Sequence, residues 1–494
     1  MPISPILFSD FYKTDHRRQY PSGTELVYSN LTPRSSRIEG VDKVVVFGLQ
    51  YFIKEYLIKR FNEDFFNQPK YDVIDAYRRI MDNSLGKNAF PLDHLEVLHD
   101  LGYLPIQIKA LPEGSLCPLR VPILTVKNTH SEFFWLTNFI ETILSNTVWT
   151  PITSATIAFE YRKLLERYAF DTSDQQEFVK WMGHDFSMRG MSSLESAIIS
   201  GGAHLTSFTG TDTIPAITWL EEYYQADCDE ELIGGSVSAT EHSVMTMGGE
   251  KGEKEIITRL LTEVYPTGIV SIVMDSYDYF QNINTTLREM KGLVLSREGK
   301  VVVRPDSGDP VKIICGDPDS TDELERKGTI QILWDIFGGT INSKGFKQLD
   351  PHIGCIYGDS ITLERCEDIC KRLKENGFAS TNMVFGIGSY TYQHVTRDVF
   401  GLAFKATAAK INGEWVSVYK DPKTDSGLKK SAKGLLAVWP IMNEDGSLGD
   451  YKLLQEVSEE EEGSGCLQTV FKDGKLVKEY SLSEIRGRLE RNLV

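Results

Sequence analysis

The 494-residue sequence predicts an α/β protein. We expect an atypical, incomplete α/β barrel and a second mixed, partly antiparallel α+β domain built from the N- and C-terminal segments. Between about residues 180 and 390, apolar runs such as KVVV and IGCIY stop at polar loops and alternate with helical stretches. This pattern is typical of a parallel sheet covered on both faces, and half a dozen such units favour a barrel. Asn412-Gly413 and Asp473-Gly474 lie between alternating segments and predict tight hairpins. The expected domains are 1–150 plus 400–494, and 151–399.

The elements follow from the spacing of apolar residues. Residues 47–61 carry them at helical spacing, 104–127 alternate as strands do, and 132–147 are apolar on nearly every side, as in a buried helix. A helix is also expected at 214–225, and another begins near residue 362 and stops at Gly377. On the latter, Cys366 and Cys370 predict a reduced apolar face rather than a metal site. Residues 456–465, EVSEEEEGSG, predict an acidic surface loop.

The charge balance excludes some classes of function. The chain has 70 acidic residues against 53 Lys plus Arg, a formal charge of −17. That argues against general nucleic-acid binding and against adhesion to anionic membranes, but a local basic pocket can still bind a small anion. The N-terminus has no basic segment before its short apolar stretch, and the run at 268–274 is too short to span a bilayer. With seven scattered cysteines, these features predict a reduced, cytoplasmic protein.

Polar and glycine residues collect where the predicted strands end. Singly, each has an ordinary explanation: an Asp caps a helix, a Gly-x-Gly forms a turn, and a lone His is structural. Together they describe a pocket with carboxylates for a metal or sugar hydroxyls, arginines for phosphate, and exposed backbone N–H groups. That combination suits a sugar phosphate held through Mg²⁺. The residues are Asp185, Arg189, Asp212, His242, Asp275, Asp278, Arg304, Asp306, Asp359, Gly386 and Gly388.

Long stretches of the chain resemble one known family. They include SDFYKTDHRRQYP at 9–21, HDFSMRGMSS, FTGTDT, ATEHSVM, MDSYD, VRPDSGDP and YGDS. The sequence resembles the nicotinamide phosphoribosyltransferases over almost its whole length. The resemblance implies a type II phosphoribosyltransferase that acts in NAD salvage as an obligate homodimer with shared active sites. The substrates would be nicotinamide and phosphoribosyl diphosphate, the products nicotinamide mononucleotide and diphosphate, with Mg²⁺ as cofactor and ATP as co-substrate.

The resemblance also implies how nicotinamide is bound. Phe186 and a second subunit's Tyr12 would hold the flat ring between aromatic faces, and Arg189 would reach the substrate. Asp212 would accept a hydrogen bond from the amide group. Because the carboxylate of nicotinate would be repelled, Asp212 favours the amide over the acid. Without the resemblance, Phe186 would be interpreted as core and Asp212 as the N-cap of the helix at 214–225.

Further residues are implied in catalysis and in phosphate or ribose binding. His242 would be phosphorylated by ATP with the assistance of Glu241 beside it, and Asp275 and Asp306 would lie near Mg²⁺. The loop GIGSY lacks the three consecutive glycines of the animal-type pattern, which affects the loop's conformation. Lys429 lies in KKSAKG, which also resembles an ordinary solvated loop. The implied phosphate and ribose ligands are Arg304, Gly358, Asp359, Gly388 and Ser389, with Arg34, Arg397, Lys405, Lys420 and Lys429 from the second subunit.

Three alternatives stay open at the level of sequence. The first is a nicotinate phosphoribosyltransferase on the same fold, against which Asp212 argues. The second is a non-catalytic signalling or nucleotide-binding relative, which the retained His242, Asp306 and Arg304 disfavour. The third is an unrelated barrel enzyme acting on a sugar phosphate, which would not need the N-terminal stretch around Tyr12.

Overall fold

The computed structural model describes residues 3–421 and 430–493, which form two compact units. The mixed unit comprises Met1–Thr156, Leu220–Ala226 and Val395–Leu489, and the barrel unit comprises Ile157–Trp219, Asp227–His394 and Glu490–Val494. The predicted ranges were 1–150 plus 400–494 for the mixed domain and 151–399 for the barrel. They placed Leu220–Ala226 in the barrel, whereas the structure places this segment in the mixed unit. Lys429, one of the predicted phosphate ligands, lies outside the described residues.

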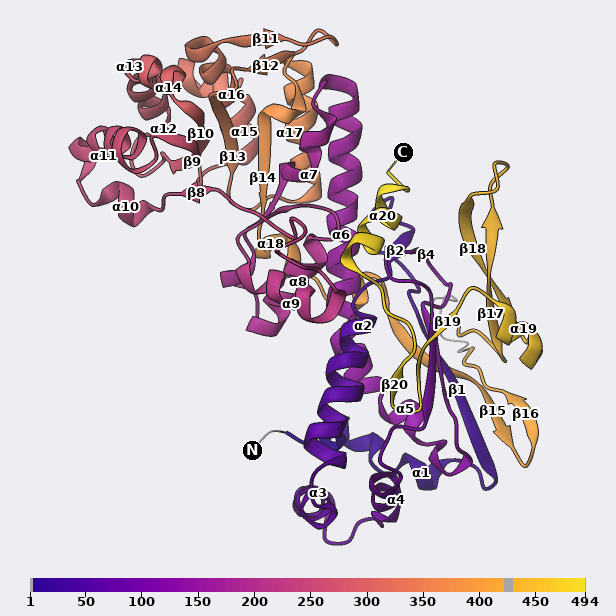
Figure 1. Cartoon of the computed structure of the whole chain (residues 1–494). Coiled ribbons are helices and arrows are strands. Elements are labelled where there is room, and N and C mark those ends of the chain that lie inside the picture. Colours follow the sequence, from indigo (N-terminus) through magenta and orange to yellow (C-terminus); the bar gives the residue numbers. More distant parts are fainter. Residues whose placement is uncertain (1–2, 422–429, 494) are drawn as a thin grey trace. The chain divides into compact units, whose positions relative to one another are not determined.

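The mixed unit is organised around a seven-stranded antiparallel sheet that joins N- and C-terminal strands (Figure 1). Its order is β16 (Glu414–Ser417), β15 (Ala403–Ile411), β1 (Thr24–Thr32), β5 (Leu124–Asn128), β3 (Ile106–Ala110), β19 (Gln468–Lys472) and β20 (Lys475–Leu476). The predicted hairpins are confirmed, because β15–β16 turns at Asn412-Gly413 and β19–β20 at Asp473-Gly474, all with positive φ. Two smaller antiparallel pairs are β2 (Lys43–Val45) with β4 (Leu116–Pro118), and β17 (Leu436–Met442) with β18 (Leu448–Gln455).

The barrel unit contains a seven-stranded parallel sheet, so the predicted α/β class and the incomplete barrel are confirmed. Its order is β7 (Gly210–Thr211), β6 (Gly183–Asp185), β14 (Met383–Ile387), β13 (Ile353–Tyr357), β10 (Glu298–Arg304), β9 (Thr267–Val273) and β8 (Ser238–Ala239). Gly235 bridges to Gly210 of β7, and three residues later the same segment enters β8 at the other end of the sheet. This short connection is what brings the two edges of the sheet together.

Both units contain helices in addition to their sheets. Those of the mixed unit include α1 (His16–Gln19), α3 (Lys70–Leu85), α4 (Asp93–Leu101), α5 (Leu136–Phe139) and α20 (Leu482–Glu490). The helix α6 (Glu141–Thr172) begins in the mixed unit and ends in the barrel unit. The barrel unit adds α7 (Val179–Met182), α8 (Leu194–His204), α10 (His242–Thr246), α11 (Glu253–Arg259), α12 (Tyr279–Gln281), α13 (Leu287–Glu289), α14 (Lys291–Ser296), α15 (Pro310–Cys315), α16 (Glu323–Phe337), α17 (Leu363–Glu375) and α18 (Ser389–Tyr392), and α9 (Ile214–Tyr224) runs from it into the mixed unit.

Several predicted helices are present with altered details. Cys366 and Cys370 of α17 are fully buried, which confirms the apolar face. Residues 47–61 form α2 (Leu49–Tyr51) followed by a π-helix at Phe52–Arg60, a winding that apolar spacing does not distinguish from a regular helix. The predicted helix at 132–147 is interrupted between α5 and α6.

The acidic segment at 456–465 lies mostly on the surface, as predicted, but it is not a loop, and Glu462 is buried. The segment contains α19 (Glu459–Ser464), which begins with a capping box between Ser458 and Glu461. Glu462 is only 7% exposed and pairs with Lys109 of β3, whose Nζ lies 3.0 Å from Glu462 Oε2. A buried lysine offers the compensating charge that brings this glutamate inside, a partner that local sequence does not reveal.

Replacement of Lys109 with Ala is expected to destabilise the mixed unit by about 3 kcal/mol, because Glu462 would stay buried without its partner. Thermal unfolding of the variant should show a clearly lowered melting temperature. Lys70→Ala is the matched control, since the Lys70–Asp100 pair is exposed and should contribute about 0–1 kcal/mol. Equal melting temperatures for the two variants would contradict the structural role of the buried pair.

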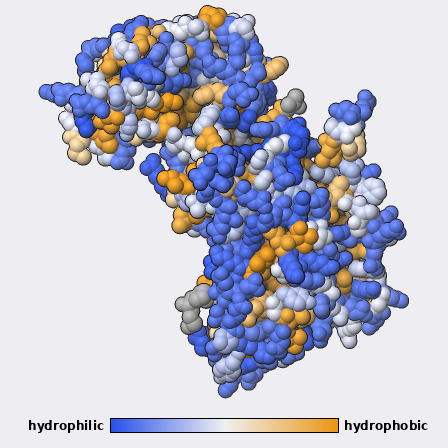
Figure 2. Space-filling model, viewed as in Figure 1, coloured by the Kyte–Doolittle hydropathy of each residue, from blue (hydrophilic) through white to orange (hydrophobic). Residues whose placement is uncertain are grey.

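The surface carries mostly hydrophilic residues on the face seen in Figure 2, with hydrophobic residues in separate groups. Within the described residues, none of the helices combines the length and apolar character needed to cross a membrane.

Candidate active site

The predicted site residues of the barrel unit lie at the carboxyl ends of its parallel strands. Across the sheet, Asp212 follows β7, Phe186 follows β6, Gly388 follows β14, Asp359 follows β13, Arg304 and Asp306 lie at the end of β10, Asp275 follows β9, and His242 follows β8. The carboxyl ends of parallel strands share one edge of a sheet, where ligands bind in α/β folds. Residues as far apart in sequence as Phe186 and Gly388 therefore share one edge of this sheet.

A small polar subsite surrounds Asp212. It is formed by residues of β6, by the loops after β6 and β7, and by the segment before β8. Asp212 Oδ1 accepts a hydrogen bond from Ser236 Oγ at 2.6 Å and lies 2.9 Å from His184 Nε2. The Phe186 ring lies beside His184, with centroids 4.6 Å apart, and is half-buried rather than in the core. We call His184, Phe186, Asp212 and Ser236 the amide subsite.

The Asp212 carboxylate is held in its ionised form. Burial alone would raise its pKa, but the hydrogen bonds from His184 and Ser236 and the charge of Arg304 outweigh burial and lower it. Within residues 3–421 and 430–493, both hydrogen bonds of the Asp212 side chain go to Oδ1. They run to His184 and Ser236, not to the first turn of α9 as the capping alternative required. The second oxygen is therefore placed to accept from a ligand.

Buried Asp185 fixes the two loops that carry this subsite. Its Oδ1 accepts from the N–H of Ser187 at 2.9 Å, and its Oδ2 accepts from Thr213 Oγ1 at 2.6 Å. One carboxylate thus ties the loop after β6 to the loop after β7, on which Phe186 and Asp212 lie. Its role in this structure is positioning.

Sequence reasoning missed His184 and Ser236. His184 lies two residues before Phe186, and in an extended segment residues i and i+2 point to the same face. The two-residue alternation of an extended segment could therefore have identified His184 as a neighbour of Phe186. Ser236 had no such signal, because it reaches Asp212 through the irregular connection from Gly235 to β8.

The two glycines of the GIGSY loop have different surroundings. A Cβ on Gly386 would lie 2.6 Å from the Phe186 ring, so this glycine makes room for the aromatic side chain. A Cβ on Gly388 would meet nothing within 4 Å. Ser389 follows it, and its hydroxyl lies so near Gly190 that a Cβ there would be 2.1 Å from Ser389 Oγ. Ser389 is thereby placed beside the loop of exposed Arg189.

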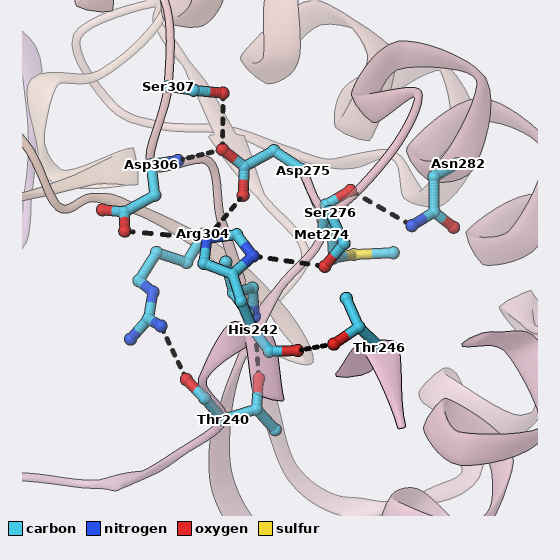
Figure 3. A network of polar contacts seen from close by, with 11 residues as sticks. Thr240, His242, Thr246, Met274, Asp275, Ser276, Asn282, Arg304, Asp306 and Ser307 are labelled. Carbon is cyan, nitrogen blue, oxygen red and sulfur yellow. Dashed lines mark hydrogen bonds and ion pairs between the residues drawn. The ribbon is translucent and has the colours of Figure 1, made fainter. Parts of the chain in front are cut away.

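His242 lies among carboxylates contributed by β9 and β10 (Figure 3). Its Nε2 is 3.7 Å from Asp275 Oδ1 and 3.9 Å from Asp306 Oδ2, and its Nδ1 is 3.2 Å from Ser276 Oγ. The imidazole is about half exposed and belongs to the first turn of α10. These contacts orient the ring while one nitrogen edge faces the acidic residues.

Glu241 does not join this cluster. It is the N-cap residue of α10, and its carboxylate accepts a hydrogen bond from Ser243 Oγ. Among the described residues, the ion-pair contacts of His242 go to Asp275 and Asp306 instead. The described contacts of the Glu241 carboxylate therefore do not include His242, the residue that it was predicted to assist.

Asp275 is the centre of the acidic cluster. Its Oδ2 accepts from the N–H of Asp306 at 2.9 Å and from Ser307 Oγ at 2.6 Å (Figure 3). Its Oδ1 is buried without a hydrogen bond to any described residue, and the nearest basic group is His242 Nε2 at 3.7 Å. An unsatisfied buried carboxylate oxygen calls for a cation or donor. Within the described chain, no group of three or more His, Cys, Asp or Glu residues is arranged to hold a metal. Mg²⁺ commonly binds through one or two carboxylates plus substrate phosphates and water, so Asp275 and Asp306 fit it.

Arg304 and Asp359 complete the polar edge. Arg304 donates from Nη2 to the carbonyl of Thr240 at 2.6 Å, and its buried Nε has no partner. Asp359 is exposed. The pKa of the nearby Tyr357 hydroxyl is raised, first because Tyr357 is buried and then because of the charges of Asp359, Asp306 and Asp275. A Cβ on Gly358 would lie 2.6 Å from Asp306 Oδ1, so this glycine leaves room for the carboxylate.

The remaining predicted residues belong to the mixed unit, where four of them line two hollows and Lys420 is exposed outside both. One, of about 270 Å³, is lined by Tyr12 and Arg397, and Tyr12 is 62% exposed. The other is lined by Arg34 and Lys405. Burial, with the nearby charges of Arg34, Lys13 and Lys420, lowers the pKa of Lys405 although Glu141 opposes the shift. The cations are thus gathered within the mixed unit itself.

Two family models and several curated relatives match this chain. The model of the nicotinate phosphoribosyltransferase (NAPRTase) family matches residues 182–475, and that of the nicotinamide phosphoribosyltransferase N-terminal domain matches 4–108. The nicotinamide phosphoribosyltransferase of Acinetobacter baylyi is 53% identical over 99% of this chain and 98% of its own. Its counterpart in Mycoplasma pneumoniae is 37% identical over 86% of this chain and 93% of its own.

Solved structures share the fold at low sequence identity. A nicotinate-nucleotide pyrophosphorylase from Pyrococcus furiosus aligns with a TM-score of 0.56 and 13% identity, covering 99% of this chain and 95% of that one. Human nicotinic acid phosphoribosyltransferase aligns with a TM-score of 0.53 and 14% identity, covering 98% and 93%. With full-length relatives at 53% and 37% identity, the chain belongs to the nicotinamide phosphoribosyltransferase family.

Proposed function

We propose that this protein transfers the phosphoribosyl group of phosphoribosyl diphosphate to nicotinamide, giving nicotinamide mononucleotide and diphosphate in NAD salvage. The observation that carries the proposal is the ionised Asp212, which has one oxygen uncommitted beside the half-buried Phe186. A carboxylate accepts from an amide NH₂ and repels a carboxylate. It therefore favours nicotinamide over nicotinate, although one matching family model is named for nicotinate.

The reaction needs positioning more than a protein nucleophile. The pyridine nitrogen attacks C1 of the ribose, the bond from C1 to diphosphate breaks, and positive charge develops on the sugar ring. Phe186 would stack on the pyridine and Asp212 would fix its amide, so that the nitrogen faces C1. Arg304, with its unpartnered Nε, would bind an anionic group at the same edge. Gly388 and Ser389 would receive the 5′-phosphate, and Asp359 the ribose hydroxyls.

Asp275 and Asp306 would hold Mg²⁺. Bound there, the ion would neutralise charge that develops on the departing diphosphate. Removal of divalent cations by a chelator is expected to abolish turnover, and added Mg²⁺ to restore it.

ATP is the proposed co-substrate, and His242 is the proposed phosphoryl acceptor. An unprotonated imidazole nitrogen attacks the γ-phosphorus, ADP leaves, and phosphohistidine forms. Support comes from the exposure of the ring and from its place beside Asp275 and Asp306. Coupled hydrolysis of the phosphohistidine would then drive synthesis.

We also propose a homodimer in which Tyr12, Arg34, Arg397, Lys405 and Lys420 of each subunit complete the site of the other, in the cytoplasm. The exposed Tyr12 ring and the gathered cations of the mixed unit support the dimer, and the buried free thiols of Cys117, Cys315, Cys355, Cys366 and Cys370 support a reducing compartment. Mixing Arg397→Ala and Asp212→Ala proteins, assayed at a nicotinamide concentration too low for either variant alone to turn over, tests sharing, because exchange yields a heterodimer with one intact site. Recovery of about a quarter of the activity is expected from random assortment of the subunits. No recovery after demonstrated subunit exchange contradicts a shared site.

Formation of nicotinamide mononucleotide from nicotinamide and phosphoribosyl diphosphate, followed by chromatography, tests the proposed reaction itself. Consumption of both substrates with equimolar diphosphate release is the expected result. A protein that binds both substrates and forms no product would instead be the non-catalytic relative.

A further inference from the structure

The backbone at Arg120 is held in a conformation that favours glycine. Arg120 lies between β4 and β5 with φ at 70°, and the N–H of Val121 donates to the carbonyl of Pro118 at 3.2 Å. Arg120 is thus the third residue of a four-residue turn. Positive φ at that position is the type II arrangement, in which glycine is preferred because it has no Cβ. A long side chain in this position is strained and is found mainly where it has a function.

The turn places Arg120 beside Arg34. The N–H of Arg120 donates to the carbonyl of Pro33 at 2.6 Å, which ties the turn to the segment after β1. Arg34 is held in turn by a hydrogen bond from its Nε to the carbonyl of Gly401 at 3.1 Å. The same hollow is lined by Asn30, Thr32, Arg34, Arg120, Lys405, Lys430 and Ser431, among others.

Three cations of this hollow have no ion-pair partner among the described residues, whereas Lys430 pairs with Asp421 at 3.1 Å. Across the described parts of the chain, no acidic side chain lies within ion-pair distance of Arg34, Arg120 or Lys405. Burial, and then the charges of Arg34, Lys13 and Lys420, lower the pKa of Lys405 against the opposing charge of Glu141. The guanidinium of Arg120 increases the repulsion among these cationic side chains unless an anion is bound. The strained backbone at Arg120 and the concentration of positive charge therefore both indicate a polyanionic ligand.

We propose that Arg120 is an anion-binding residue whose guanidinium binds the diphosphate group of the sugar donor, alongside Arg34 and Lys405. The planar guanidinium offers five N–H donors and can bind two oxygens at once, which suits a diphosphate better than a point charge does. The inference rests on the proposed function for the identity of the ligand. It adds a residue that neither motif nor spacing indicates, because position 120 is a turn position.

The test is Arg120→Gly, which removes the guanidinium and relieves the backbone. The KM for phosphoribosyl diphosphate is expected to rise about tenfold, as is the Kd for inorganic diphosphate measured by calorimetry. The KM for nicotinamide at saturating phosphoribosyl diphosphate and the melting temperature should not worsen. Arg120→Gln keeps the strain and removes the charge, and the same loss of affinity is expected.

Two controls separate charge from backbone. Arg120→Lys should recover part of the affinity, because one charge and fewer donors remain. Asn88→Gly replaces another residue of positive φ, 57°, and should leave both constants unchanged. If both Arg120→Gly and Arg120→Gln match the parent in KM and Kd, the inference is overturned. An absence of nicotinamide mononucleotide in the parent would instead contradict the proposed function, and the diphosphate titration would still test Arg120.

Discussion

Asp212→Ala is expected to raise the KM for nicotinamide about a hundredfold and to change that for phosphoribosyl diphosphate less than threefold. The reason is that Asp212 supplies a charge-assisted hydrogen bond, worth about 2–3 kcal/mol, to the amide group alone. The lowered pKa keeps this acceptor ionised at neutral pH. Steady-state kinetics with each substrate varied in turn measure the two constants.

Ser236→Ala is the matched control for the Asp212 prediction. It removes one donor to Asp212 Oδ1 and leaves the carboxylate in place. A smaller rise in the same KM, about fivefold, is expected because the carboxylate is held less firmly. Equal losses for nicotinamide and phosphoribosyl diphosphate in the Asp212 variant would contradict its role in amide recognition.

His242→Ala is expected to abolish phosphoenzyme formation and the stimulation of synthesis by ATP, while a weak basal transferase remains. The imidazole is the one group of the acidic cluster that can accept a phosphoryl group as a neutral nitrogen nucleophile. Incubation with γ-labelled ATP, followed by detection of acid-labile label on the protein, measures the phosphoenzyme.

Ser276→Ala is the matched control for the His242 prediction. It removes the hydroxyl that lies 3.2 Å from His242 Nδ1 but leaves the acceptor, so slower labelling is expected rather than none. Full ATP stimulation in the His242 variant would show that another residue, or no residue, is phosphorylated.

The sequence predicted the layers of the fold because their signals are local. Near-continuous apolar runs predict buried parallel strands, and Asn412-Gly413 predicts a hairpin that needs positive φ. The features that could not be predicted depend on contacts between residues that are far apart in the sequence. The burial of Glu462 depends on Lys109, more than 350 positions earlier, and no property of the acidic run itself indicates this pairing.

The site shows the same division. Strand-end positions such as Asp212, Asp275 and Asp306 could be predicted, since the end of each apolar run is visible in sequence. Their hydrogen bonds could not, because the irregular connection at Gly235 decides which side chain reaches Asp212. Glu241 illustrates the converse: it is adjacent to His242 in sequence, yet its carboxylate contacts Ser243.

The most direct test of the central claim is the ratio of kcat/KM for nicotinamide to that for nicotinic acid, measured with the unmodified protein at saturating phosphoribosyl diphosphate. An ionised Asp212 beside the ring predicts a ratio well above about 100, because the acid would both lose a hydrogen bond and place two carboxylates together. A ratio below one, with nicotinic acid as the better substrate, would contradict the account.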